Sequence, residues 1–295
     1  MRAARIHGYG GPEVMRLDEV PTPQPGAGQV LVKVRAASVN PIDWKMRRGV
    51  LKGIFPLTFP RTLGRDCAGE LNGKLVAGVA DPRGEGTHAE YAVLPETSVA
   101  PVPVGLDAAE AASLCIAGLS AWIPLVEVAK VQKGMRVLIH GGAGGVGCHA
   151  IQIARELGAS VVTTSTQADY CKQLGAERVV DYRKEDFTKA GPFDVVLDTL
   201  GGEAHVSSFK ALKTNGVLVA LSATPVPAHA PRTDVRVERA TILATRERLA
   251  EIFDWVIKGK LRPQLSRRFH LEAANDAYAA VEAPHGRGKI ILDIS

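Results

Sequence analysis

The spacing of apolar and polar positions divides the chain near residue 108. Before that point, short alternating runs are broken by proline and glycine, as in residues 30–36, which read Val-Leu-Val-Lys-Val-Arg-Ala and follow Pro21, Pro23 and Pro25. A period of two predicts half-buried strands, and the prolines exclude a helix. Residues 1–112 are therefore predicted to form an antiparallel, partly open β-barrel.

From residue 108 the apolar spacing becomes helical, and beyond Gly134 predicted strands alternate with predicted helices. The strands cover Arg136–His140, Ser160–Thr164, 178–181, Phe193–Asp198 and 216–221, and the helices follow Gly145 and cover residues 167–174 and 203–212. This alternation predicts a parallel, doubly wound sheet. After Gly259 a helix over 272–282 and a strand over 290–294 are predicted. This tail completes either the parallel sheet or the first domain, and the pattern does not decide between them.

A glycine cluster follows the first strand of the parallel sheet. Gly142, Gly144 and Gly147 have the spacing G-x-G-x-x-G, and an amphipathic helix follows them. Such glycines permit a tight turn, close approach of the backbone to a pyrophosphate, and close packing of helix on strand. A glycine-rich stretch alone is often only a loop, but a loop between the first strand and its helix is where a dinucleotide binds.

Composition narrows the class of protein. The chain has 295 residues, 46% of them hydrophobic, and a formal net charge of +5 from scattered basic residues. The charge suits an anionic small ligand or simply a solvated surface, and no nucleic-acid-binding module is present. We found no targeting signal and no apolar run of the roughly 20 residues that a membrane helix needs, so a cytoplasmic protein is expected.

The four cysteines, Cys67, Cys115, Cys148 and Cys171, lie far apart and form no C-x-x-C pair. This spacing fits neither a zinc cage nor a disulfide framework. Reduced, mostly buried thiols are expected, with Cys67 as a small core residue.

Five stretches carry a family pattern in order along the chain: residues 36–43, 63–69, 117–122, 142–147 and 194–202. With them the chain resembles the medium-chain dehydrogenase/reductase superfamily, and within it the zinc-independent quinone oxidoreductases of the zeta-crystallin-like branch. The resemblance covers essentially the whole chain.

The resemblance implies an α/β fold with three segments. A GroES-like, partly open β-barrel forms the catalytic domain over residues 1–112, and a Rossmann doubly wound parallel-sheet domain binds NADPH over residues 113–260. Residues 261–295 return to the catalytic domain. A homodimer is also implied, with a small-molecule substrate and no nucleic-acid or membrane partner.

The resemblance also allows a test for zinc. The positions that match the catalytic metal ligands of the zinc-containing relatives are Asn40, Arg65 and Ile116, and none of these is a competent zinc ligand. Cys115 is adjacent, but one thiol does not make a tetrahedral site. We therefore predict no metal.

A quinone suits a reductase that has no metal, because hydride addition gives a delocalised anion that needs only modest stabilisation. Conjugated enones come second. Asn40 is predicted to donate an amide hydrogen bond to the substrate oxygen, or alternatively to cap the turn beside Pro41. Asp43 and Lys45 match cleft positions of the family, or else form a charged pair on a solvated turn. Residues 48–55 contain no tyrosine to act as a proton donor, so a solvent proton is expected.

The cofactor is predicted to be NADPH. The stretch 163–166, Thr-Thr-Ser-Thr, ends the second strand, where NAD-binding sites carry an acidic residue for the ribose. Hydroxyl groups are able to donate to a 2′-phosphate, whereas a carboxylate repels it. Asp169 weakens this argument unless it faces away as an early helix residue.

Contacts to the cofactor are predicted for a defined set of residues, with Tyr182 taken from the resemblance and Lys289 as a counter-charge for phosphate. The set is Ser120, Gly142, Ala143, Gly144, Gly145, Val146, Gly147, Thr164, Ser165, Tyr182, Gly201 and Lys289. His140 ends an apolar strand, so we expect it to be structural rather than catalytic.

Three functions remain open at this level. The first is an NADPH-dependent reductase that transfers hydride to a quinone. The second is an enone or enoyl reductase with the same cofactor. The third is a cofactor-binding structural or nucleic-acid-associated protein with little catalysis.

Overall fold

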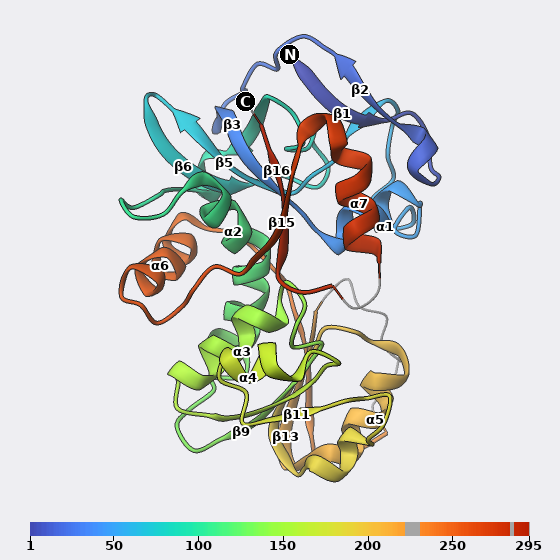
Figure 1. Ribbon diagram of the computed structural model, residues 1–295, viewed down its shortest axis with the longest axis vertical. Coiled ribbons are helices and arrows are strands. Elements are labelled where there is room, and N and C mark those ends of the chain that lie inside the picture. The colour runs from blue at the N-terminus through green and yellow to red at the C-terminus, as the bar shows by residue number, and fades with distance from the viewer. Residues whose placement is uncertain (222–230, 284–285, 295) are drawn as a thin grey trace. The chain divides into compact units, whose positions relative to one another are not determined.

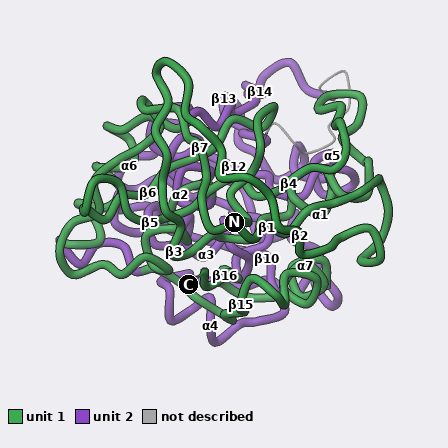
Figure 2. Tube along the Cα trace, turned by 90° about the horizontal axis from the view of Figure 1, so that it is seen from above, with its two compact units in different colours: residues 1–116, 244–257, 263–295 green, residues 117–243, 258–262 purple. Residues whose placement is uncertain are grey.

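The computed structural model describes residues 1–221, 231–283 and 286–294, and the chain divides into two compact units (Figure 2). Unit 1 contains Met1–Ile116, Ala244–Ile257 and Pro263–Ser295, and unit 2 contains Ala117–Leu243 and Lys258–Arg262. Residues 244–257 therefore belong to unit 1, although the expected range 113–260 includes them. The reason is that their helix packs against a strand of unit 1. Its residues Leu249, Ile252 and Phe253 are buried.

Unit 1 is built on two sheets. Its smaller sheet has the order β2-β1-β4, with β1 at Arg2–Ile6, β2 at Met15–Glu19 and β4 at Arg61–Thr62. Its larger sheet has the order β15-β16-β3-β5-β6-β8, with β7 also paired to β3. The strands of this sheet are β3 Gln29–Val39, β5 Asp66–Leu71, β6 Lys74–Val79, β7 Tyr91–Pro95, β8 Val99–Pro101, β15 Leu265–His270 and β16 Lys289–Asp293.

Helices close the sheets of unit 1 (Figure 1). The α-helices are α1 Pro41–Arg47, α6 Arg246–Ile257 and α7 Ala274–Glu282, and short 3-10 turns lie at Pro12–Val14, Glu96–Ser98 and Leu271–Ala273. Apolar residues from both sheets and from α7 form one core, in which Ile6, Leu94 and Tyr278 are fully buried. The sheet domain expected for this part of the chain is therefore present.

The C-terminal strand β16 belongs to the larger sheet of unit 1 and not to the parallel sheet. It runs antiparallel to β3, with Ile290 opposite Val39 and Leu292 opposite Ala37. Strand β5 pairs with the other side of β3, with Ser38 opposite Asp66. The register therefore brings the first residue of β16, the last residues of β3 and the first residue of β5 close together.

Unit 2 is a parallel sheet of the order β11-β10-β9-β12-β13-β14. Its strands are β9 Arg136–His140, β10 Ser160–Thr164, β11 Arg178–Val180, β12 Phe193–Asp198, β13 Leu212–Leu221 and β14 Arg236–Ala240. Its helices are α3 Gly147–Glu156, α4 Ala168–Gln173 and α5 Gly202–Ala211, with a 3-10 turn at Phe187–Ala190. The strand order reverses between β9 and β12, and this switch point is where doubly wound sheets bind ligands.

Helix α2, Ala108–Trp122, continues into a π-helical turn at Ile123–Val128. Together these 21 residues are long and apolar enough to cross a membrane by length and composition, so the expectation that no such stretch exists was wrong. The most apolar window of this helix is 78% buried inside the protein, and this burial accounts for its composition.

Candidate functional site

The glycine loop lies at the switch point of unit 2. Strand β9 is a run of buried residues that ends at His140, and Gly141 then turns the chain with a φ of +68°. The loop folds back on itself, because the Gly144 N–H donates to the carbonyl oxygen of Gly141 at 3.0 Å and the Cys148 N–H donates to that of Gly144 at 2.9 Å. Helix α3 begins at Gly147. The strand, turn and helix predicted from the sequence are all present.

Each of the three motif glycines meets a different environment. A Cβ atom on Gly142 would lie 2.1 Å from Thr163 Oγ1, and one on Gly147 would lie 2.2 Å from the carbonyl oxygen of Gly141. A Cβ atom on Gly144 would meet only the carbonyl oxygen of Gly141, at 3.3 Å. The first and third glycines are thus required for packing, whereas a side chain on the second would meet a single backbone atom. This arrangement fits the cradle of a dinucleotide pyrophosphate, with Ala143, Gly145 and Val146 in the same turn.

His140 and Thr164 support this loop through hydrogen bonds. Thr164 Oγ1 accepts the Gly141 N–H at 3.1 Å and lies 3.2 Å from His140 Nδ1, and the Thr164 carbonyl accepts the Gly142 N–H at 3.1 Å. His140 Nε2 is 2.8 Å from Ser208 Oγ, which itself donates to the Ala204 carbonyl. Burial lowers the pKa of His140 to about 4, so the ring is neutral at physiological pH. The structural role expected for His140 is confirmed.

Other predicted cofactor residues lie along the same edge of the sheet. His140, Thr164 and Asp198 are the last residues of the neighbouring strands β9, β10 and β12, so the segments that follow them share one carboxyl edge. Ser165 is buried there and accepts the Gln167 N–H, and Tyr182, which follows β11, is 49% exposed. Ser120 lies buried on α2 in the same unit.

Asp198 holds the Gly201 turn in place by hydrogen bonds. It was not among the predicted site residues. Its Oδ1 accepts the N–H groups of Leu200 and Gly201, at 2.9 and 2.8 Å, and its Oδ2 lies 2.8 Å from Nδ1 of His205. Gly201 has a φ of +76°, a conformation that favours glycine. A polar residue that ends an otherwise apolar buried strand was the signal available in the sequence.

A second group of polar residues is buried in unit 1. Asn40 precedes α1, and its backbone N–H donates to Asp43 Oδ2 at 2.7 Å, which closes the first turn of the helix. Asp66 begins β5; its Oδ1 accepts from Ser38 Oγ and Asn40 Nδ2, both at 2.7 Å, and its Oδ2 accepts the Ile116 N–H at 2.8 Å. We call Ser38, Asn40, Asp43, Asp66 and Lys289 the acidic cluster.

Asn40 makes several hydrogen bonds within unit 1. Its amide nitrogen donates to Asp66 and lies 3.3 Å from both the carbonyl and the hydroxyl oxygen of Ser38, and its Oδ1 accepts from Lys289 Nζ at 2.6 Å. The side chain is only 2% exposed. Its hydrogen-bonding groups therefore have partners within the cluster, and its donation to a substrate stays a prediction.

Asp43 and Lys289 also differ from expectation. Asp43 is fully buried, so the alternative of a solvated turn is wrong. Burial raises the pKa of Asp43 to about 7, and its Oδ1 has no hydrogen-bond partner within the described residues. Lys289 is 3% exposed and belongs to unit 1, where it also approaches the Val39 carbonyl at 3.5 Å. A solvated Lys289 is therefore excluded, and its role as a counter-charge for phosphate stays a prediction.

The three positions matched to metal ligands do come together, but not as a zinc site. Asn40 and Ile116 both donate to Asp66, and Arg65 precedes Asp66 in the chain. Within residues 1–221, 231–283 and 286–294, no group of three His, Cys, Asp or Glu side chains is placed to hold a metal ion. An amide already bonded to Lys289, a guanidinium and an isoleucine do not fit zinc.

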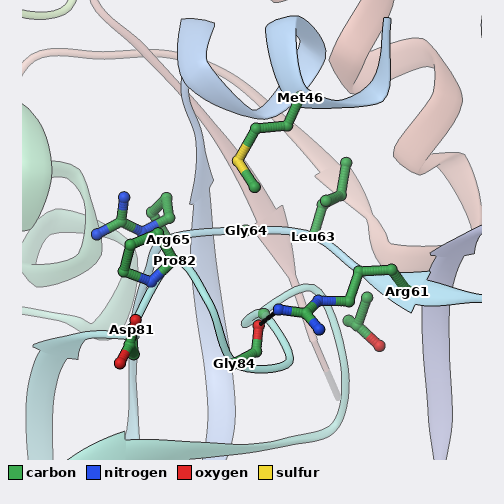
Figure 3. Close-up of a pocket in the computed structure, with 10 residues that line it drawn as sticks. Met46, Arg61, Leu63, Gly64, Arg65, Asp81, Pro82 and Gly84 are labelled. Carbon is green, nitrogen blue, oxygen red and sulfur yellow. Dashed lines mark hydrogen bonds between the residues drawn. The ribbon is translucent and has the colours of Figure 1, made fainter. Parts of the chain in front are cut away.

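A pocket adjoins this region within unit 1 (Figure 3). Met46 of α1 points toward the loop of Leu63, Gly64 and Arg65, and Arg61 lies across from Asp81. The Arg61 guanidinium donates to the Gly84 carbonyl, which fixes that wall. Burial lowers the pKa of Arg65, which donates from Nε to the Ala80 carbonyl.

Known proteins share this sequence and fold. Residues 26–74 match the model of the alcohol dehydrogenase GroES-like domain, and residues 174–292 match that of the zinc-binding dehydrogenases. A chloroplastic quinone-oxidoreductase of Triphysaria versicolor is 31% identical over 99% of this chain and 98% of its own length.

Solved structures of other proteins have a similar fold. The quinone oxidoreductase of Coxiella burnetii is 34% identical, with a TM-score of 0.91 over 100% of this chain and 99% of that one. A mycobacterial protein complexed with NADPH, Rv1454c, is 29% identical, with a TM-score of 0.89 over 99% of both chains.

A GroES-like sheet unit joined to a Rossmann unit with an open glycine cradle defines a nicotinamide-dependent oxidoreductase. The chain belongs to the medium-chain dehydrogenase/reductase superfamily, in its quinone oxidoreductase branch.

Proposed function

We propose that the protein is an NADPH-dependent reductase that passes a hydride to a quinone. The observation that carries the proposal is the cradle around Gly144, which is open where a pyrophosphate needs close approach to the backbone. The N–H groups of the loop and of the first turn of α3 would hold the phosphates, and the bound cofactor would supply the hydride.

The preference for NADPH is supported by the end of β10. Residues 163–166 contain no carboxylate, and Asp169 lies in the first turn of α4, where the helix dipole favours a negative charge. Thr163 donates to the Ile139 carbonyl and Thr164 supports the glycine loop, so these two hydroxyls are engaged within unit 2. Ser165 and Thr166 are the other hydroxyl-bearing residues of this stretch and are candidates for contact with a 2′-phosphate.

A second function is favoured by one relative. A 2-methylene-furan-3-one reductase of Solanum lycopersicum is 33% identical over 99% of this chain and 79% of its own length. Its name describes reduction of a conjugated carbonyl. We therefore keep an enone reductase with the same cofactor as the alternative.

The experiment is a comparison of NADPH oxidation rates over three sets of acceptors: quinones, 2-enones and enoyl thioesters. Higher kcat/KM with quinones than with the other two sets supports the first proposal, and the reverse supports the alternative. Gly144→Val is the matched control, and it should lose both NADPH binding and turnover. A cofactor fluorescence change without oxidation on any acceptor would instead indicate a binding protein.

A further inference from the structure

The Gly201 turn lies beside the glycine loop within unit 2. Thr199 Oγ1 donates to the carbonyl oxygen of His140 at 2.8 Å. A Cβ atom on Gly141 would lie 3.2 Å from Thr199 Oγ1 and 3.7 Å from Leu200 Cδ2. The Leu200 side chain is 55% exposed, although its neighbour Gly201 is buried. The turn therefore adds an open apolar surface to the edge on which the glycine loop lies.

Asp198 holds this turn, and His205 holds Asp198. One carboxylate oxygen of Asp198 accepts from the backbone of the turn, and the other lies 2.8 Å from His205 Nδ1. A carboxylate only accepts, so Nδ1 carries the hydrogen. The side chains of Asp198 and His205 are 0% and 3% exposed. Loss of the histidine would leave one oxygen of a buried carboxylate without a donor among the described residues, which is costly. The turn would then be held less firmly.

Helix α5 fixes the ring of His205. The ring packs against that of Phe209 in the same helix, edge to face, with 5.4 Å between the ring centroids. One turn further along the helix, Ser208 Oγ lies 2.8 Å from His140 Nε2. Helix α5 therefore contacts the last residues of both β12 and β9, which are the two strands at the switch point. One rigid element thus supports the loops that follow both strands.

The strand order indicates which half of a cofactor meets the turn. A dinucleotide spans the switch point of a doubly wound sheet, with one nucleotide on each side. The residues considered for the 2′-phosphate follow β10, on one side of β9, whereas the Gly201 turn follows β12, on the other side. The 2′-phosphate belongs to the adenosine half. The turn is therefore on the side of the nicotinamide half.

We propose that His205 is a positioning residue for the nicotinamide half of the cofactor. Through Asp198 it holds the Gly201 turn in one conformation, so that the Leu200 side chain is already in place when the nicotinamide binds. A preformed contact is completed at a lower entropic cost than a mobile one. The inference rests on the proposed function, of which it uses only the binding of NADPH.

The test measures dissociation constants for NADPH and for adenosine 2′,5′-bisphosphate, its adenosine half, by isothermal titration. His205→Leu removes the donor, and His205→Asn keeps a nitrogen donor at the same number of bonds from Cα. His7→Leu is the control, because His7 and Asp18 form a similar pair in unit 1, at 2.9 Å. We expect the NADPH dissociation constant to rise about 10-fold in His205→Leu, to recover largely in His205→Asn and to stay unchanged in His7→Leu. The constant for adenosine 2′,5′-bisphosphate should be the same in all.

Amide hydrogen exchange, followed by NMR without cofactor, reports on the turn directly. The N–H groups of Leu200 and Gly201 should exchange faster in His205→Leu than in the wild type, because the carboxylate that accepts them is less firmly held. The Gly142 N–H, which donates to the Thr164 carbonyl, should exchange at the same rate in both.

Two results would overturn the inference. One is an unchanged NADPH dissociation constant in His205→Leu. The other is an equal rise for NADPH and for adenosine 2′,5′-bisphosphate, which would mean that the variant disturbs unit 2 as a whole. If His205→Leu does not fold, the double variant Asp198→Asn with His205→Leu, which has no buried unpaired carboxylate, is compared with Asp198→Asn alone. The same rise for NADPH alone is expected.

These readouts need no turnover, so the inference and the proposed function fail separately. If the binding constants follow the expected pattern but no quinone is reduced, the proposed reaction is refuted and the inference stands. If quinones are reduced but His205→Leu binds NADPH as the wild type does, the inference alone is refuted. If the wild type binds NADH in place of NADPH, the preference for NADPH is refuted, and the same pattern is expected with NADH and 5′-AMP.

Discussion

The carboxyl edge of the sheet in unit 2 and the acidic cluster of unit 1 present polar groups in opposite ways. At the edge, the loop backbone provides the N–H groups, and Gly144 leaves the space in front of them open. In the cluster, side chains provide the charges, and nearly every donor and acceptor has a partner inside the unit. One region is shaped to be completed by a ligand, and the other is already assembled.

The difference separates two ways of making a site. A backbone cradle depends on where side chains are absent, so its weak points are the positions at which an added Cβ atom would collide. A cluster of buried charges depends on every member, so its weak points are the charges themselves. Substitutions should therefore act through packing in unit 2 and through electrostatics in unit 1.

The largest effect is expected at Gly147. In Gly147→Val the new side chain would collide with the carbonyl of Gly141 and the Cα atom of Gly142, and because both are backbone atoms they are unable to move aside easily. We expect a loss of more than about 3 kcal/mol in the free energy of unfolding, together with loss of NADPH binding. Urea denaturation and fluorescence titration measure the two quantities.

Gly144→Ala is the control for this prediction. Its Cβ atom would lie 3.3 Å from one carbonyl oxygen, so stability should change by no more than about 0.5 kcal/mol while NADPH affinity falls. Equal destabilisation by both variants would contradict the distinction between packing and ligand-facing glycines.

The titration of Asp43 should be visible in the pH dependence of the free energy of unfolding. Burial raises its pKa from 3.8 to about 7, so over this range the folded protein holds a proton that the unfolded chain has released. The contribution to stability is complete below the unfolded value and is lost as the pH rises, at about 1.4 kcal/mol per pH unit. The other charged or titratable groups that face the same region are kept unchanged in this experiment. They are Asp66, Arg65, Lys289, Tyr278 and Arg47.

Asp43→Asn should remove this slope, since an asparagine oxygen still accepts the Asn40 N–H but does not titrate. The measurement is the difference in unfolding free energy between wild type and variant at pH 5 and at pH 6.5. A difference that stays constant between these two values would show that Asp43 is already ionised at pH 5.

The smallest effect is expected at Thr164. Its hydroxyl supports the glycine loop, so Thr164→Val should weaken NADPH and NADH binding by a similar factor, corresponding to about 1 kcal/mol. Isothermal titration with both cofactors tests this. A selective loss of NADPH affinity would restore the original interpretation, in which Thr164 binds the 2′-phosphate.

The parts of the fold that could be predicted are those in which the signal is local. Arg136–His140 and Phe193–Asp198 were predicted with their observed bounds, because buried parallel strands are short apolar runs between turns. Strand Leu265–His270 was missed, because it is a largely exposed edge strand of mostly polar residues. Without a buried face, it has no alternation to detect.

The candidate site also contains one part with a local signal in the sequence and one part without it. The glycine cradle was predicted from spacing within six residues, whereas the partners of Asn40 lie 26 and 249 residues away. Those contacts exist because β5 and β16 pair with opposite sides of β3 in one particular register. No pattern along the chain encodes that register, so the contact between Asn40 and Lys289 could not be predicted.

The place of β16 in the sheet has a consequence for synthesis. Residues 289–293 leave the ribosome after all of unit 2 has been made, so the segment of β3 from Ala36 to Val39 waits for its partner until then. Until then this strand has an open edge, a form of surface that invites pairing with other chains. A nascent chain that stops short of Lys289 carries that open edge, and its Asn40 side-chain oxygen lacks the ammonium from which it accepts.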